Sequence, residues 1–123
     1  MTDELRKETE NLAANVEACR RTLIAIGDET RQHIIIEMIR MDPGGVRVPE
    51  LTARTNLSRP AVSHHLGILR DAGIVKMRKE GRMNWYYLDP DMKAFSRLSS
   101  ALMQAVEICA KLPDRSGRNP DEH

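Results

Sequence analysis

Apolar side chains recur at alternating steps of four and three residues in two long stretches, one near each end of this chain. In the first stretch, from about residue 2 to residue 25, the stripe and its continuation consist of Leu12, Val16, Cys19, Leu23 and Ile26. In the second, which ends at about residue 111, the stripe consists of Phe95, Ser99, Leu102, Val106 and Cys109. Each spacing predicts an amphipathic helix with a narrow apolar seam of the coiled-coil type.

These two terminal helices are longer than the core of one small domain requires. Two interpretations are open: the helices pack only on their own chain, or they form an interface between two copies of it. The second interpretation predicts a homodimer, with an interface that includes Leu12, Val16, Leu23, Phe95, Leu102 and Val106.

Another helix is expected directly after the first. Gly27 interrupts the first pattern, and Asp28 is a residue type that caps helix N-termini. The side chains expected to face the core are apolar and helically spaced, namely Ile34, Ile35, Met38 and Ile39.

The clearest loop is DPGG at residues 42–45. Its two glycines do not predict a nucleotide site, because no lysine-serine or lysine-threonine pair follows them. Residues 46–48 are expected to add a short strand before Pro49 opens the next helix.

Residues 51–69 have the pattern of a short helix, a tight turn and a second helix. Asn56 tolerates the left-handed backbone that ends a helix, and Ser58 can cap the next one. Pro60 falls in the first turn of that second helix, where its missing N–H leaves no hydrogen bond unmade. The second helix has one apolar stripe, formed by Val62, Leu66 and Leu69.

The opposite side of this second helix carries short, hydrogen-bonding side chains and an arginine at each end. Its members are Arg59, Ser63, Gly67 and Arg70. Such a face fits the floor of a DNA major groove. We expect Arg59, Pro60, Ser63 and His64 at the base edges, Ser58 beside them, and Arg70 nearer the phosphates.

A two-stranded hairpin is expected at residues 74–88. Val75 and Met77 alternate with charged neighbours, and Gly81 supplies the positive φ of a tight turn. Three of its cations, Arg78, Lys79 and Arg82, lie in or next to the turn half of the hairpin and give it the composition of a DNA-binding wing. The alternative is a hairpin whose charges only face solvent.

Asp89 and Pro90 are expected to start the last helix, with aspartate as the cap and proline at the first position. The chain from residue 113 to residue 123 is rich in proline, glycine and charge and has no apolar face. We therefore expect one DNA-binding and dimerisation domain over residues 1–112 and a disordered tail over 113–123.

Charge is unevenly distributed, although the net charge of the 123 residues is only +1. Residues 58–84 contain six lysines and arginines against two acidic residues, whereas residues 1–30 contain four against seven. The local positive field of the helix-turn-helix and hairpin favours binding of nucleic acid.

Composition and patterning exclude several classes of protein. No apolar run approaches 18 residues, so no membrane span is expected, and the acidic N-terminus lacks a secretory apolar segment. We expect a cytoplasmic protein with reduced cysteines. Side chains of the adjacent His64 and His65 point about 100° apart on a helix and cannot easily share a metal ion. No catalytic constellation is recognisable, so neither an enzyme nor a cofactor is expected.

Three segments taken together resemble the winged helix-turn-helix repressors of the ArsR/SmtB family. They are GDETRQHII (27–35), VPELTARTNLSRPAVSHHLGILRDAGIV (48–75) and KEGRMNWYYL (79–88). The resemblance implies a mainly α fold with a small β-hairpin wing. It also implies a homodimer that represses transcription from double-stranded operator DNA and is released by a chemical signal whose identity is unknown.

An alternative function is a winged-helix module that binds proteins and not specific DNA, since fold alone does not decide function. The face of residues 59–70 and the basic hairpin discriminate between the two. A protein-binding variant would carry apolar or acidic residues there.

The metal sites of the family are not matched in this chain. Residues 49–57 contain no cysteine, and Asp89, Asp91 and Glu107 occur with no histidine between residues 89 and 112. We expect no metal site, although a thiolate site shared across a dimer stays open. Because some relatives sense oxidants through a cysteine pair, Cys19 and Cys109 are candidates for a thiol sensor. The alternative is that both only fill the apolar seam.

Overall fold

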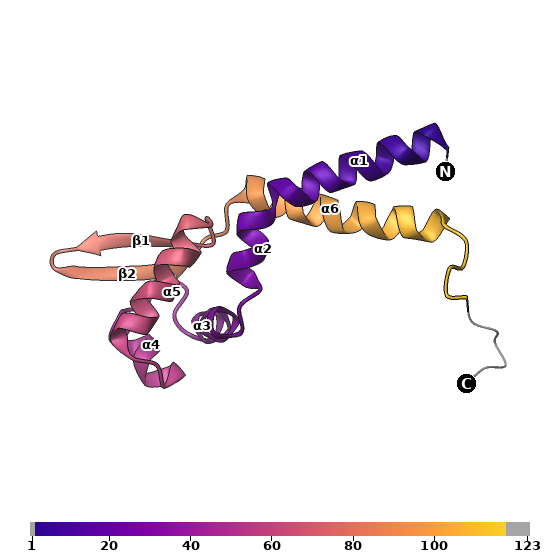
Figure 1. The fold of residues 1–123 in the computed structure, drawn as a ribbon. Coiled ribbons are helices and arrows are strands. Elements are labelled where there is room, and N and C mark those ends of the chain that lie inside the picture. The colour runs from indigo at the N-terminus through magenta and orange to yellow at the C-terminus, as the bar shows by residue number, and fades with distance from the viewer. Residues whose placement is uncertain (1, 118–123) are drawn as a thin grey trace.

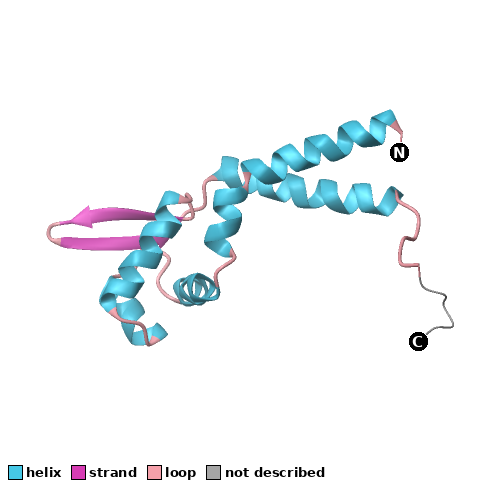
Figure 2. Cartoon of the chain, viewed as in Figure 1, coloured by secondary structure: helices cyan, strands magenta, loops and turns pink. Residues whose placement is uncertain are grey.

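The computed structural model describes residues 2–117, which form six helices and one antiparallel hairpin. In chain order the elements are α1 (Asp3–Ala18), α2 (Arg20–Ile26), α3 (Glu29–Arg40), α4 (Val48–Thr55), α5 (Arg59–Asp71), β1 (Val75–Glu80), β2 (Met83–Leu88) and α6 (Met92–Lys111). Helices α2 to α5 gather into a body from which the hairpin projects on one side, and α1 and α6 extend side by side on the other (Figures 1 and 2). The expected fold class, mainly α with a β-hairpin wing, is confirmed.

The core of the body lies between α3, α4 and α5. Ile34, Leu51, Val62, Leu66 and Leu69 are fully buried there. The expected apolar stripe of the second helix of the helix-turn-helix is therefore confirmed. So is the turn before it, in which Asn56 has φ +59° and the Ser58 hydroxyl accepts a hydrogen bond from the Ala61 amide at 3.2 Å.

The first helix differs from expectation, because it breaks at Cys19. The Cys19 amide donates to both the Asn15 and the Val16 carbonyls, and α2 then leaves at a steep angle to α1 (Figure 1). The break lets α1 lie along α6 while α2 turns its buried residues, Thr22 and Ala25, into the body. The apolar spacing continues across the break, so the seam pattern gave no sign of it.

Helix α3 begins as expected, with the Asp28 carboxylate accepting a hydrogen bond from the Arg31 amide at 2.9 Å. Ile34 and Met38 are buried and Ile35 is half-buried, but Ile39 is 67% exposed. The expectation for Ile39 is wrong, because the residue after Met38 is rotated by about 100° from the buried face.

The hairpin has the expected register and turn. Val75 pairs with Leu88 and Glu80 with Met83, which leaves a two-residue loop that starts with Gly81 at φ +63°. The strand expected at residues 46–48 is reduced to a single bridge between Val46 and Tyr86. Helix α4 already begins at Val48, so Pro49 is its second residue.

The start of α6 is displaced by two residues from the expected position. Asp91 is the cap, and its carboxylate accepts a hydrogen bond from the Lys93 amide at 3.0 Å. The Asp89 carboxylate instead pairs with Lys76 at 2.7 Å, and the Asp91 amide donates to the Gly73 carbonyl. These contacts keep residues 89–91 extended beside the end of α5, so the helix cannot begin earlier.

Helices α1 and α6 run antiparallel. The Asn15 amide group donates to the Gln104 side chain at 3.2 Å, and Lys111 lies 3.3 Å from Glu8. Helix α6 buries Leu98, Ala101 and Ile108, whereas α1 buries none of its residues. After α6, residues 113–117 form no helix or strand; the rest of the tail for which disorder was expected lies outside the described residues.

Candidate nucleic-acid interface

The outer face of α5 is presented to solvent along its whole length. Because the stripe of Val62, Leu66 and Leu69 packs inward, the opposite side chains are left uncovered. The residues expected to contact DNA from this element are all exposed: Ser58, Arg59, Pro60, Ser63, His64 and Arg70. The chain therefore offers an unobstructed convex helix with a cation at each end, which is the shape that enters a major groove.

Gly67 lies among these residues. A Cβ atom added to it would meet no atom within 4 Å, so packing inside the chain does not require glycine here. Glycine in a helix interior is also destabilising by roughly 0.5–1 kcal/mol relative to alanine. Because Gly67 has no side chain, the backbone of α5 is accessible to another molecule at this point of the outer face.

His64 and His65 have different surroundings, as expected from their positions on the helix. His64 is exposed on the outer face, whereas His65 is half-buried toward α3. Their ring centroids are 5.4 Å apart with an interplanar angle of 65°. The orientation of the exposed ring is thus linked to that of the half-buried one.

The three hairpin cations expected to contact DNA, Arg78, Lys79 and Arg82, are not equivalent. Lys79 and Arg82 are exposed near the tip, and within the described residues neither forms an ion pair. Arg78 donates from Nε to Glu80 at 2.8 Å and from Nη1 to the Gly44 carbonyl. Its guanidinium also lies over the rings of Trp85 and Tyr87.

Arg78 therefore fastens the hairpin to the loop at residues 42–45. Gly45 has φ +142°, and a Cβ atom on it would approach Arg78 Nη1 to 3.0 Å. The sequence showed the two glycines and the arginine separately, but it gave no sign that they meet. Among the described residues, the hairpin cations without an ion pair are therefore Lys79 and Arg82, whereas Arg78 lies midway along β1, opposite Trp85.

Comparison with known proteins decides the family. The family model "Bacterial regulatory protein, arsR family" matches residues 28–77. An HTH-type transcriptional regulator of Methanocaldococcus jannaschii is 42% identical over 67 residues, which cover 54% of this chain and 73% of the relative. One of Mycobacterium tuberculosis is 41% identical over 95 residues, covering 76% of this chain and 86% of that one.

The chain belongs to the ArsR family. A solved ArsR-like regulator from Rhodococcus sp. RHA1 superimposes with a TM-score of 0.58 at 26% identity, over 80% of this chain and 85% of its own. The resemblance seen in the sequence is confirmed. The protein is thus a DNA-binding transcriptional regulator and not an enzyme, as its relatives are regulators.

The two cysteines of this ArsR-family regulator are far apart within one chain. Cys19 is 2% exposed and lies in a hollow with Ala94 and Arg97 near the start of α6, whereas Cys109 is exposed near its end. Twelve residues of helix separate Arg97 from Cys109, which is roughly 18 Å at the usual rise. A disulfide requires Cα atoms within about 7 Å. Within one chain the two sulfurs are therefore too far apart to form a disulfide.

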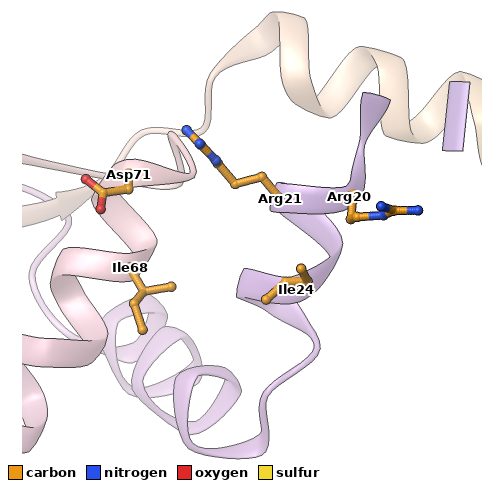
Figure 3. Close-up of a pocket in the computed structure, with 5 residues that line it drawn as sticks. All are labelled: Arg20, Arg21, Ile24, Ile68 and Asp71. Atoms are coloured by element: carbon orange, nitrogen blue, oxygen red, sulfur yellow. The ribbon is translucent and has the colours of Figure 1, made fainter. Parts of the chain in front are cut away.

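A hollow of about 580 Å³ lies between α2 and α5 (Figure 3). Ile24 and Ile68 face each other across it, Arg21 and Asp71 lie at its edge, and Arg20 is directed away from the other four residues. Opposite charges at the edge do not single out one class of ligand.

Within residues 2–117, no helix has the length and apolar character needed to cross a membrane. No group of three or more histidine, cysteine or acidic side chains within residues 2–117 is placed to hold a metal ion.

Proposed function

We propose that this regulator is a homodimeric repressor that reads operator DNA with α5 and the hairpin of each subunit. The observation that carries the proposal is the outer face of α5, which is exposed, polar and cationic at both ends. A protein-docking module would instead be expected to present apolar or acidic side chains there. Base contacts are assigned to Arg59, Pro60, Ser63 and His64, and phosphate contacts to Ser58, Arg70, Lys79 and Arg82.

The dimer is proposed from the terminal helices. Leu102 and Val106 are 59% and 62% exposed, and Met103 beside them is also exposed. Val16 on α1 is exposed as well, while Leu12, Leu23 and Phe95 are half-buried. An apolar surface of this kind marks an interaction site. A second copy of the same helix pair is the occupant that would also place two α5 helices for a two-fold symmetric operator.

Release by a chemical signal is the remaining part of the proposal. If the signal is an oxidant or a reactive sulfur species, Cys109 is the thiol that meets it, because it is exposed and Cys19 is buried. Modification of Cys109 would then act at the interface between subunits, since its helix carries the exposed seam. A regulator of this kind works where the chromosome lies, so we place it in the cytoplasm.

Selection of duplexes from a random pool, followed by sedimentation of the complex, tests the proposal. The expected result is a two-fold symmetric site with half-sites roughly 34 Å apart, bound by two chains. Addition of oxidant should weaken the complex of wild-type and Cys19→Ser protein but not that of Cys109→Ser. Recovery of no preferred sequence would reject specific DNA recognition, and an oxidant effect that persists in Cys109→Ser would reject the thiol assignment.

A further inference from the structure

Arg31 is a charged residue that is only 7% exposed, in the first turn of α3. Its Nε donates to the Ala25 carbonyl at 2.8 Å, and its Nη2 donates to the Ile24 carbonyl at 2.9 Å. Both carbonyls belong to the last turn of α2, where a helix has no intrahelical donors left to satisfy them. The guanidinium therefore caps α2 from the following helix.

The remaining nitrogen of the same guanidinium reaches the recognition helix. Arg31 Nη1 lies 3.3 Å from Nδ1 of His65 on α5. A guanidinium has donors and no acceptor, so this contact requires an unprotonated Nδ1, with the proton of the neutral ring on Nε2. One side chain thus joins the end of α2, the start of α3 and the middle of α5.

The contact is sensitive to the charge of His65. Burial lowers the pKa of His65, the Asp28 carboxylate opposes this effect, and the charges of Arg31 and His64 lower the pKa further. Asp28 precedes α3, Arg31 lies on it, and His64 is on α5 itself; these are the charged and titratable groups that act on the ring within the described residues. A second proton would occupy Nδ1, facing a guanidinium that cannot accept it.

We propose that Arg31 is a positioning residue for DNA binding, which holds the recognition helix through His65, and that protonation of His65 releases this hold. The inference rests on the proposed operator binding. The hydrogen bonds of Arg31 fix the orientation of α5 relative to α2. Helix α2 in turn connects to α1, one of the two helices of the proposed dimer interface. Through the neighbouring ring it also orients His64 on the DNA-reading face. Acidification should therefore weaken binding even though it adds positive charge to the protein.

The first experiment needs no DNA. Nitrogen-15 NMR of the histidine rings in wild-type protein at pH 7.5 should show His65 with its proton on Nε2 and a bare Nδ1. A proton on Nδ1 would overturn the proposal, because the hydrogen bond from Arg31 could not exist.

The second experiment measures affinity against pH, for a duplex selected by the wild-type protein. His64→Gln serves as the background, because it removes the exposed histidine of the DNA-reading face and leaves His65 as the histidine of α5 under test. In this background affinity should fall about tenfold between pH 7.5 and 5.5, the effect of losing one hydrogen bond. Adding His65→Gln, which keeps an acceptor but does not titrate, should remove the fall.

Two further variants separate positioning from general stability. His65→Leu, made in wild-type protein, leaves Arg31 without its acceptor and should bind weakly at every pH. Glu37→Gln is the matched control, because Glu37 is a buried acid on α3 whose ion pairs are with Arg40 and Arg54 and not with α5. It should lower the unfolding temperature and leave the pH profile unchanged.

The outcomes distinguish this inference from the proposed function. If no duplex is selected at any pH, operator binding itself has failed. If a duplex is selected but adding His65→Gln to the His64→Gln background leaves the pH profile of affinity unchanged, only the role of Arg31 and His65 is rejected. Wild-type affinity in His65→Leu would reject it as well.

Discussion

The winged-helix body and the terminal helix pair differ in how far each is completed by one chain. In the body, apolar residues from α3, α4 and α5 bury one another fully, as Ile34, Leu51 and Val62 show. In the terminal pair, α1 contains no buried residue and α6 leaves Leu102, Met103 and Val106 exposed. The body has a core of its own, whereas the terminal pair leaves an apolar surface uncovered, which the proposed dimer would bury.

The polar contacts between α1 and α6 do not compensate for this exposure. Lys111 and Glu8 form an ion pair at 3.3 Å, with the Lys111 side chain 60% and the Glu8 side chain 30% exposed, and ion pairs at the surface contribute roughly 0–1 kcal/mol. Burying one large apolar side chain is worth about 1.5–3 kcal/mol. The arrangement of the terminal helices is therefore expected to depend on what covers the α6 seam, and that of α5 on the core beneath it.

The largest effect is expected from a charge placed in the exposed seam. Leu102→Glu should abolish the dimer, and with it tight operator binding, because a carboxylate would be buried among apolar side chains. The folded body should survive, since Leu102 is not part of its core. Sedimentation and gel shift measure the two properties. Ser100→Glu puts the same charge on another face of α6 and should change neither; a Leu102→Glu monomer that still bound its operator tightly would contradict the link.

A smaller effect is expected from Arg59 on the exposed face of α5. Arg59→Ala should weaken operator binding by about 1–3 kcal/mol and relax the preference at one position, if the guanidinium reads a guanine. Repeating the random-pool selection with the variant measures both. Arg115→Ala, which removes a cation distant from α5 in the chain, is the control. Unchanged preference would show that Arg59 contacts only the backbone of the DNA.

The winged-helix body and the terminal helices also differ in how much of their structure could be predicted from the sequence. The body could be read from sequence because caps and turns act locally: Asp28, Asn56 and Ser58 each behave as their residue types dictate. The break at Cys19 could not be predicted, because the apolar spacing continues through it. It occurs where α1 lies along α6 and no longer continues the direction of α2. The start of α6 was displaced for a similar reason, namely backbone contacts with residues distant in sequence.

In the candidate site too, contacts between residues distant in sequence could not be predicted. The exposed cations of α5 were found because helical spacing gives their direction. The roles of Arg31 and Arg78 were missed, because each depends on a partner 34 residues away, His65 and Gly44 respectively. The pattern of hydrophobic residues does not indicate that an arginine is buried.

The hairpin cations should show two different kinds of effect. Lys79→Ala with Arg82→Ala should weaken binding of all sequences alike and reduce the slope of log affinity against log salt by roughly 0.9 for each phosphate that is no longer neutralised. Arg78→Ala should instead lower the unfolding temperature, because it detaches the hairpin from the Gly44 carbonyl. Salt titrations and thermal melts separate the two. An unchanged slope in the double variant would place the hairpin tip away from the DNA.

The smallest effect, and one with opposite signs on two properties, is expected at Gly67. Gly67→Ala should stabilise the protein by roughly 0.5–1 kcal/mol, because alanine loses less backbone entropy in a helix and the added Cβ meets nothing within 4 Å. If the outer face of α5 approaches the groove floor closely, the same methyl group should reduce operator affinity by a few-fold, since a carbon must be accommodated at the interface. Thermal unfolding and a gel shift on one preparation measure both changes. Ala53→Gly on the exposed side of α4 makes the reverse substitution away from α5 and should lower stability without changing affinity. A Gly67→Ala protein that is more stable and binds as tightly as wild type would show that the helix does not lie with this face against the DNA.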